Sequence, residues 1–416
     1  MPGTSNDNTF IPQFIRKHFE LNTVEHQDSI YAYYFYRLIQ RAENITFVYN
    51  TDQTQTGKAE ISRFLLQLLT ESGLDIKRLS LQTAIRPVGE IQITIPKTTA
   101  LLEKLRRQYD LNVNPEAHRL SPSALNTFID CSLKFYYQYV EGLKAAEELS
   151  DELDSSIFGS IFHKAAELLY KKTGGAEDVD RERPILITKE QLELFLKTPP
   201  LLEKIVAQAF SSVFFKGREV LPSQYNGEQI INFKVINHLL RRLISYDVQQ
   251  APFFICGLEL PVYDYFDLPS FDVKIKVGGI IDRIDEKDNI LRIVDYKTSG
   301  AGKPFKTLDD LVAQTDKRAS HVFQLFTYAS VLIKNGEKSA ISPALLYLQE
   351  AGKEGYSPIV PFEGEPITDF SNISTAFIDT LIQKISALFN PDIPFSQTVA
   401  TGKCAYCDFN ILCNRM

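Results

Sequence analysis

The feature that most constrains this chain is a change in hydrophobic period near residue 253. Before that point, apolar residues recur at helical spacing through 158–172 and 188–250. Beyond it, apolar and polar residues alternate through 253–266, 271–285 and 289–300, with a polar EKD turn between the last two runs. Helices followed by alternating strands favour an α/β fold with a sheet at its centre.

The remaining elements add helices around that sheet. Residues 321–335 and 371–389 have helical patterns, and 344–350 read as a further strand. Ser121 and Pro122 occupy the N-cap and first positions of a helix that opens LSPSALNTFIDCSLKFYYQYVEGL, residues 120–143. We therefore expect a mixed sheet that is flanked by helices.

The run ILRIVDYKTSG, residues 290–300, holds two opposite charges inside an apolar strand. Because side chains alternate along a strand, Ile293, Asp295 and Lys297 share one face. A hairpin that closes through KD or EKDN pairs Asp282 with Ile293 and brings Asp282 to the same face. Two carboxylates beside a lysine can hold a divalent cation and orient its water, whereas the simpler alternative is a buried salt bridge between Asp295 and Lys297.

Other polar side chains are predicted to join this group. His163 lies on the helix at 158–172, whose Gly159 is expected to allow close packing against the sheet. Gln324 and Tyr328 are four residues apart, so they share one face of the helix after the hairpin. Glu259, in GLELP, is expected to be an exposed strand residue outside the site.

Three cysteines near the end of the sequence have the spacing of metal ligands. Cys404, Cys407 and Cys413 form C-x2-C-x5-C. Three thiolates need a fourth ligand, and Cys131 is the candidate, because Cys256 lies in an apolar strand and reads as a buried small hydrophobe. Such a site would clasp the two ends of the domain together. Spacing alone leaves a four-iron cluster and zinc as alternatives.

The composition limits the classes of protein that fit the chain. Its 416 residues exceed what one core usually holds, so two domains are expected. The net charge of −7 excludes a chain-wide positive field, and a nucleic-acid partner would need a local basic groove. No apolar run reaches the roughly 18 residues that span a bilayer. The five cysteines, an odd number, argue against a disulfide framework, and we expect a cytoplasmic protein. The candidates for phosphate contact are Lys104, Arg106, Arg107, Arg241 and Arg242.

Taken in order, these motifs resemble the iron-sulfur branch of the PD-(D/E)XK nucleases, the RecB-type exonuclease domain. The likeness is closest to the C-terminal region of the AddB-type subunits of helicase-nucleases. It covers 120–416 and rests on several motifs in the right order, although Ser132 replaces the proline that commonly follows the first cysteine. The matching segments are Cys131, Gly159 to His163, GIIDRID (279–285), DYKT (295–298), QLFTYA (324–329) and the terminal cysteines.

The resemblance implies a metal-dependent DNA exonuclease. It implies that Mg²⁺ or Mn²⁺ is bound by His163, Asp282, Asp295 and the backbone carbonyl of Tyr296. Lys297 would position or deprotonate the attacking water, and Gln324 and Tyr328 would hold the DNA backbone or brace Lys297. A structural 4Fe-4S cluster, with zinc less favoured, would be held by Cys131, Cys404, Cys407 and Cys413. The implied partners are an AddA-type helicase subunit and the single strand it unwinds, in double-strand break repair and recombination.

Residues 1–85 look like a small α/β remnant of an inactive helicase-like domain. Residues 28–40 and 60–72 have helical patterns, and 45–50 read as a strand. Arg41 resembles an arginine of a late helicase motif, but no complete Walker A sequence occurs, so no ATPase activity is expected. We expect residues 86–118 to be a connector, residues 119–416 to be the nuclease domain, and the chain to be a fragment of a longer subunit.

Two other functions stay open at this point. A non-catalytic DNA-binding or scaffolding module would keep the fold without activity, although the intact Asp282, Asp295, Lys297 and His163 argue against it. A metal-dependent hydrolase of another phosphoester would use the same residues.

Overall fold

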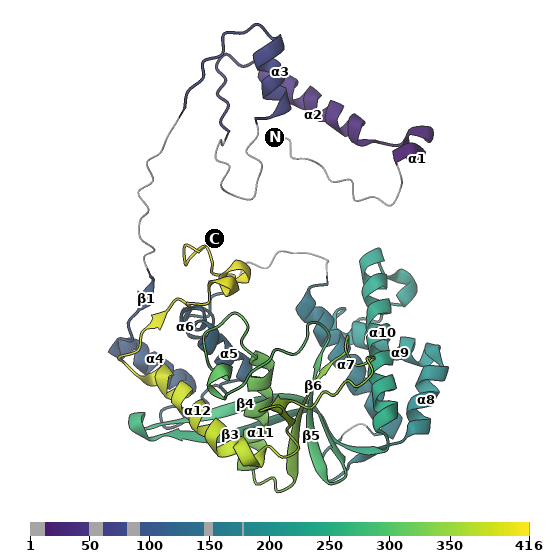
Figure 1. Ribbon diagram of the computed structural model, residues 1–416, viewed down its shortest axis with the longest axis vertical. Coiled ribbons are helices and arrows are strands. Elements are labelled where there is room, and N and C mark those ends of the chain that lie inside the picture. Colours follow the sequence, from purple (N-terminus) through teal and green to yellow (C-terminus); the bar gives the residue numbers. More distant parts are fainter. Residues whose placement is uncertain (1–12, 50–60, 81–91, 145–152, 177–178, 416) are drawn as a thin grey trace. The chain divides into compact units, whose positions relative to one another are not determined.

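The computed structural model describes residues 13–49, 61–80, 92–144, 153–176 and 179–415 (Figure 1). The chain forms two compact units, residues 1–89 and 90–416. Among the described helices, none is long and apolar enough to cross a membrane.

The smaller unit is helical where it is described. It contains α1 (Gln13–His18), α2 (Val24–Ile39) and α3 (Arg63–Glu71). Phe35 of α2 stacks on Phe64 of α3 with ring centroids 5.5 Å apart, so the two predicted helices are confirmed and pack together. The predicted strand at 45–50 is wrong over its described residues 45–49, which are irregular because no described strand of the unit offers them a partner. Residue 50 lies outside the described residues.

The larger unit is built on a five-stranded mixed sheet of order β2-β3-β4-β5-β6. Its four antiparallel strands, each paired with the next, are β2 (Ile185–Ile187), β3 (Phe253–Leu268), β4 (Val273–Lys287) and β5 (Ile290–Lys297). Strand β6 (Ala340–Tyr347) is parallel to β5, and α11 (Ser320–Lys334) makes the crossover between them. The predicted α/β class with a mixed sheet is confirmed.

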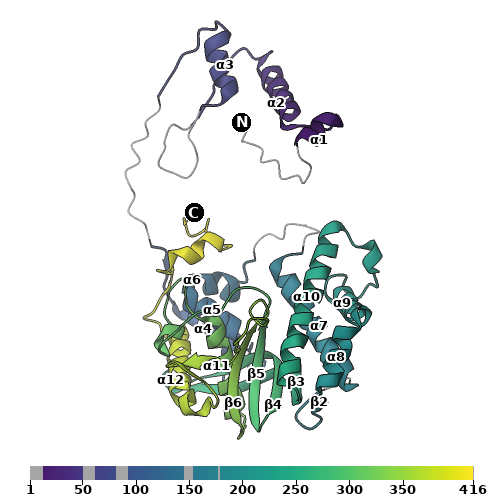
Figure 2. The same cartoon turned by 45° about the vertical axis from the view of Figure 1, so that its right-hand side comes forward.

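Helices cover both faces of this sheet (Figure 2). On one face lie α4 (Thr99–Tyr109), α5 (Pro122–Asp130), α6 (Ser132–Phe135), α11 and α12 (Ser371–Phe389). On the other lie α7 (Ser155–Gly174), α8 (Lys189–Lys197), α9 (Pro199–Val213) and α10 (Gly227–Gln250). Strand β5 separates the two cores by alternation, since Ile293 packs in the first and Val294 and Tyr296 pack in the second.

Residues 92–118, which were expected to lie in a connector, instead pack into the larger unit. Strand β1 (Thr94–Ile95) pairs with β9 (Phe395–Ser396), so segments far apart in sequence lie side by side. Helix α4 buries Leu105 and Tyr109 in the core shared with α5 and β4. A basic face on α4 had suggested a solvated linker, but the apolar face of the same helix decides its position.

The β4–β5 hairpin has a different register from the one predicted. Lys287 pairs with Ile290 across a two-residue turn, and Ile293 faces Ile284 rather than Asp282. The turn residues Asp288 and Asn289 have φ angles of 53° and 61°, a left-handed conformation that Asp and Asn tolerate well. The pairing is shifted by two residues, and an even shift leaves the predicted face of Asp282 unchanged.

Candidate active site

The two predicted carboxylates lie together at the end of the β4–β5 ladder. Regular pairing stops at Arg283 and Val294, and just beyond it the amide nitrogen of Tyr296 donates to Asp282 Oδ2 over 2.8 Å. Asp282 is 9% exposed and Asp295 is 3% exposed. Burial, together with the nearby charge of Asp295, raises the pKa of Asp282. A bound cation would relieve this repulsion between the carboxylates.

Asp295 is held from both sides. Lys297 Nζ lies 2.6 Å from Asp295 Oδ2, and Gln324 Nε2 donates to Asp295 Oδ1 over 3.1 Å. The same Gln324 nitrogen lies 3.3 Å from the hydroxyl of Tyr328. The structure therefore brings Lys297, Gln324 and Tyr328 together around Asp295, as the sequence predicted.

Tyr328 reaches the sheet because Gly279 leaves room for it. A Cβ at Gly279 would stand 2.7 Å from the Tyr328 hydroxyl, closer than real Cβ contacts allow. Burial raises the pKa of Tyr328 to about 12, so the hydroxyl keeps its proton at neutral pH. The glycine of GIIDRID thus admits a neutral hydrogen-bonding group beside the carboxylates.

His163 of α7 faces the carboxylates from the opposite helical layer. Its Nδ1 lies 3.3 Å from Asp282 Oδ1 and 3.7 Å from Glu259 Oε1. Burial disfavours the charged imidazole, but the carboxylates of Asp282, Glu259 and Asp295 outweigh burial and raise the pKa of His163 to about 10. The ring is therefore held in an anionic environment that would equally attract a metal ion.

Glu259 belongs to this group, and its predicted place outside the site is wrong. Potential ligand atoms of His163, Glu259 and Asp282 all lie within 4.8 Å of one another. Glu259 has a φ angle of 46°, and the β3–β4 register shifts between Ile255 and Gly257, so simple alternation fails here. The glycine and proline that flank GLELP were the available signal of an irregular strand.

A hollow of about 530 Å³ opens in front of His163 and Glu259. Its other walls come mainly from the first turns of α7, including Ser156, Gly159 and Ser160. Gly159 was expected to allow close contact with the sheet, but no heavy atom lies within 4 Å of where its Cβ would stand. The glycine instead keeps the entrance to the site wide.

The donor set fits a hard divalent cation. One imidazole and two carboxylates converge, without a thiolate, and such ligands suit Mg²⁺ or Mn²⁺. Asp295 lies outside this three-residue group, because its oxygens are bound by Lys297 and Gln324. The hydrogen bond from Tyr296 keeps the backbone of that residue against Asp282.

The remaining charges of GIIDRID form a buried network behind the site. Arg283 Nη1 and Nη2 donate to Asp247 of α10 over 2.7 and 3.1 Å, and Arg283 Nε lies 2.9 Å from Asp285. Arg292 of β5 lies 2.5 Å from the other oxygen of Asp285. The Arg283 guanidinium also packs over the ring of Tyr296, 5.7 Å from its centroid. This network joins α10, β4 and β5 next to the residues that surround Asp282.

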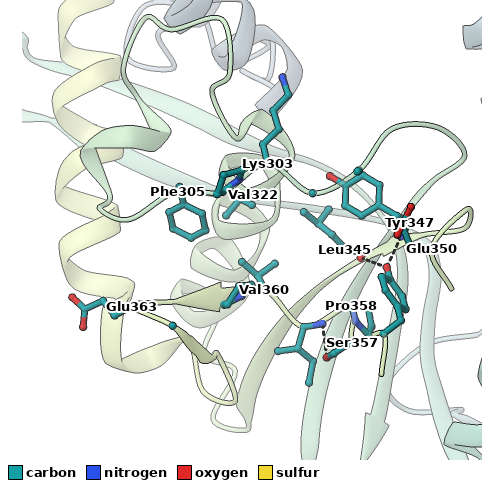
Figure 3. A pocket seen from close by; sticks show the side chains of 17 residues that line it. Lys303, Phe305, Val322, Leu345, Tyr347, Glu350, Ser357, Pro358, Val360 and Glu363 are labelled. Atoms are coloured by element: carbon teal, nitrogen blue, oxygen red, sulfur yellow. Dashed lines mark hydrogen bonds between the residues drawn. The ribbon is translucent and has the colours of Figure 1, made fainter. Parts of the chain in front are cut away.

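A second hollow, of about 410 Å³, borders the site on the side of β6 (Figure 3). Tyr347 lines it and is the β6 partner of Lys297. Its hydroxyl lies 3.1 Å from Nδ1 of His321. Burial and the charge of Lys297 lower the pKa of His321 to about 4, so this histidine is neutral at physiological pH.

The cysteines predicted to bind metal line one small cavity. Cys131, Cys404, Cys407 and Cys413 surround a space of about 110 Å³. Cys131 ends α5 and begins α6, and its Sγ accepts from the amide of Lys134 over 3.4 Å. Cys256 lies elsewhere, buried in the sheet core. Burial raises the pKa of Cys131 and of Cys413.

The spacing of these sulfurs distinguishes between the two occupants. Tetrahedral zinc with Zn–S bonds of about 2.3 Å brings sulfurs to roughly 3.8 Å from one another. Within the described ranges, no three cysteine sulfurs lie within 4.8 Å of one another. The cavity therefore fits a larger cluster better than a single zinc ion.

Residues near Cys131 and the C-terminal segment tie the cavity together. Ser132 Oγ accepts from the amide of Ser396 over 2.9 Å and lies 3.2 Å from the Ser396 carbonyl oxygen. Gln397 Nε2 donates to the carbonyl of Cys413 over 2.7 Å. The serine that replaces the usual proline thus makes a polar contact to β9.

Most of the predicted phosphate-binding cations are occupied within the protein. Lys104 pairs with Glu141 at 2.7 Å, and Arg107 pairs with Glu103 at 3.5 Å. Arg106 donates to the carbonyl of Phe271. Arg242 donates to the carbonyls of Leu348 and Gln349, and Arg241 is half-buried on α10. These side chains do not define a common basic groove.

Comparison with known proteins agrees with this site. A family model for the PD-(D/E)XK nuclease superfamily matches residues 119–414. The chain belongs to the PD-(D/E)XK nuclease superfamily. The carboxylates and lysine of the β4–β5 hairpin are the residues from which this superfamily takes its name, and the resemblance inferred from the sequence is confirmed.

Two relatives are named as AddB-type subunits of an ATP-dependent helicase/deoxyribonuclease. The protein from Streptococcus agalactiae serotype Ia is 27% identical over 250 residues, which are 60% of this chain and 19% of that protein. The protein from Carboxydothermus hydrogenoformans is 29% identical over 233 residues, which are 52% of this chain and 19% of that protein. The chain thus matches about a fifth of the length of these relatives and resembles an AddB-type nuclease region.

Proposed function

We propose that this chain is a divalent-metal-dependent deoxyribonuclease module that hydrolyses phosphodiester bonds of a DNA strand. The observation that carries the proposal is the convergence of His163, Glu259 and Asp282 beside the Asp295–Lys297 pair. Such a set supplies anionic ligands, a cation and an open approach in one place.

His163, Glu259, Asp282 and Asp295, with the backbone carbonyl of Tyr296, would hold Mg²⁺ or Mn²⁺. The ion, when bound, would supply Lewis acidity to the scissile phosphate and to the attacking water. Lys297, 2.6 Å from Asp295, holds its ammonium where it can orient that water. Gln324 keeps Asp295 in place through a 3.1 Å hydrogen bond and links it to Tyr328.

The cysteine cavity supports a structural 4Fe-4S cluster in our proposal. Four thiols line it, and no sulfur trio in the described part of the chain is close enough for a preformed zinc site. Since Cys131 lies at the start of the nuclease unit and the other three near residue 413, such a cluster would join those segments.

The names of the relatives suggest a setting for the module. We propose that it works beside an AddA-type helicase subunit, which would deliver an unwound single strand during double-strand break repair and recombination. Exonucleolytic digestion of that strand is the expected reaction. The scaffolding alternative would require that the assembled metal site be silent.

The decisive test is degradation of end-labelled single-stranded DNA with Mg²⁺, Mn²⁺ or EDTA. The wild-type chain, prepared anaerobically, is compared with Asp295→Asn, and Asp264→Asn serves as a matched carboxylate control on the far part of β3. Cleavage that requires the cation and is lost only in Asp295→Asn is expected. A folded wild-type chain that stays inactive with either cation, alone and with a helicase subunit added, would refute the nuclease proposal and favour the scaffold.

A further inference from the structure

One sheet surface outside the metal site combines exposed tyrosines with lysines. The β3–β4 hairpin continues beyond β5, since β5 pairs with β4 only from Arg283 to Lys287 (Figure 1). On this distal part, α11 covers one face, where Val262 and Phe266 are buried in the core. The opposite face carries Tyr263 and Tyr265, which are 42% and 43% exposed.

The register brings basic residues onto the same open face. Tyr265 pairs with Lys276 and Tyr263 pairs with Gly278, so the tyrosines and lysines share a face because directly opposed residues do so. Lys276 Nζ lies 3.8 Å from the centroid of the Tyr263 ring, and Lys274 Nζ lies 5.6 Å from that of Tyr265. We call this face, made of Tyr263, Tyr265, Lys274 and Lys276, the hairpin track.

The charges of the track are not consumed by the protein. Neither Lys274 nor Lys276 forms an ion pair with a carboxylate among the described residues. Arg119, at the edge of β4, donates to the carbonyl of Gly279 over 3.4 Å and adds a third cation. Asp267 of β3 adds an acidic residue to this face, opposite Lys274 at the far end. The local charge is positive, although the whole chain carries −7.

The track leads directly to the metal ligands. Along β3, Tyr263 is four residues from Glu259, about 14 Å at the usual rise of a strand. Along β4, Lys276, Ile280 and Asp282 follow at even spacing on one side of the strand. A ligand that lies along the track would therefore arrive at the site between Glu259 and Asp282.

We propose that the hairpin track binds the single-stranded DNA segment next to the scissile phosphate. Unpaired bases would stack on Tyr263 and Tyr265, while Lys274, Lys276 and Arg119 would contact phosphates, the combination that single-strand-binding surfaces use. A duplex keeps its bases stacked on one another, so the track would favour single strands. This inference rests on the proposed nuclease function and names the route of its substrate.

The test measures binding and chemistry separately on the full chain. Binding of a labelled single-stranded oligonucleotide, and of its duplex, is followed by fluorescence anisotropy in EDTA, where no cleavage is expected. Chemistry is followed with Mn²⁺ and bis(p-nitrophenyl) phosphate, a diester too small to reach the track. The variants are Tyr263→Ala with Tyr265→Ala, and Lys274→Gln with Lys276→Gln. The matched controls are Phe254→Ala, an aromatic residue 45% exposed at the other end of β3, and Lys204→Gln, an exposed lysine on α9.

The tyrosine variant is expected to bind the single strand at least about fivefold more weakly. The lysine variant is expected to lower the salt dependence, since two lost phosphate contacts at about 0.7 each reduce the slope by about 1.4. Hydrolysis of the small diester should not change in either. Unchanged single-strand affinity in both variants, or an equal loss in the controls, would overturn the track. If the wild type binds DNA through the track but hydrolyses neither substrate, the nuclease proposal fails and the track stands.

Discussion

The amide nitrogen of Tyr296 and the carboxylate of Asp282 are joined by a hydrogen bond of 2.8 Å. The bond forms where the regular β4–β5 ladder has ended, so it takes the place of a backbone pair. It orients one oxygen of Asp282 toward β5 and leaves the other 3.3 Å from Nδ1 of His163. One carboxylate thus serves both the strand pairing and the candidate metal site.

These two roles of Asp282 are separable by substitution. Asp282→Asn keeps an oxygen that can accept from the Tyr296 amide, so stability should be largely retained while metal-dependent cleavage is lost. Asp282→Ala leaves that buried amide without a partner, which costs about 1–3 kcal/mol in addition. Urea unfolding in EDTA and the cleavage assay together check this. Equal stability of the two variants would contradict the structural role of the hydrogen bond.

Lys297→Gln removes the ammonium beside Asp295 without removing a metal ligand. We expect cleavage to fall by about 10²–10⁴-fold, the usual contribution of a group that assists proton transfer to or from water. Mn²⁺ affinity, measured by isothermal titration calorimetry, should not fall, because a competing cation has been removed. Lys338→Gln, at an exposed position, is the control and should change neither quantity. A weakened Mn²⁺ affinity in Lys297→Gln would show that the lysine supports the site instead.

Glu259→Gln tests the ligand that alternation along β3 concealed. Replacing its carboxylate by an amide should weaken Mn²⁺ binding by at least about tenfold. Because the other ligands persist, cleavage should recover as the Mn²⁺ concentration is raised. Glu203→Gln, exposed on α9, should titrate like the wild type. If Glu259→Gln needs no additional Mn²⁺, the glutamate is a bystander at 3.7 Å from His163.

Asp247→Asn should reveal the energetic weight of the network behind the site. Arg283 is 1% exposed and Asp247 is fully buried, and removal of one partner leaves a charge uncompensated in the interior. A loss of about 3 kcal/mol in the free energy of unfolding is expected, because Asp285 still compensates part of the charge on Arg283. Asp264→Asn, whose partner Lys334 lies 3.7 Å away, should cost less than about 1 kcal/mol. Similar losses in the two variants would contradict this distinction.

Cys131→Ser should lower the iron content of anaerobically purified protein, since one of four thiolates is lost. Cys256→Ser is the matched control, because Cys256 lies outside the cysteine cavity. Iron and acid-labile sulfide are measured per chain, with zinc measured in parallel. Zinc in place of iron in the wild type would overturn the cluster assignment, and unchanged iron in Cys131→Ser would exclude this cysteine as a ligand.

Period and motif order predicted much of the nuclease unit. The alternation of 253–300 gave three strands of the central sheet, and Ser121 caps α5 by accepting from the amide of Ala124, as expected. Asp295, Lys297, Gln324 and Tyr328 were found because their roles depend only on strand parity and helical spacing, which are local properties.

The missed features depend on non-local or irregular geometry. The hairpin register followed from the left-handed Asp288 and Asn289, whereas polarity alone had suggested a turn one residue earlier. Glu259 joined the site through a local irregularity that period two does not express. Strands β1 and β9 are two residues long and pair across most of the unit, so neither carries a recognisable pattern alone.

That pairing has a consequence for biosynthesis. The amide of Ile93 donates to Oε1 of Gln397 across 304 positions of sequence. At the usual 5–20 residues per second, a ribosome needs about 15–60 s to add the intervening residues. Helix α4 therefore emerges long before the strand that seals its edge. The cavity that gathers the four cysteines is completed only in the final moments of translation of this region, after the metal-binding hairpin has already left the ribosome.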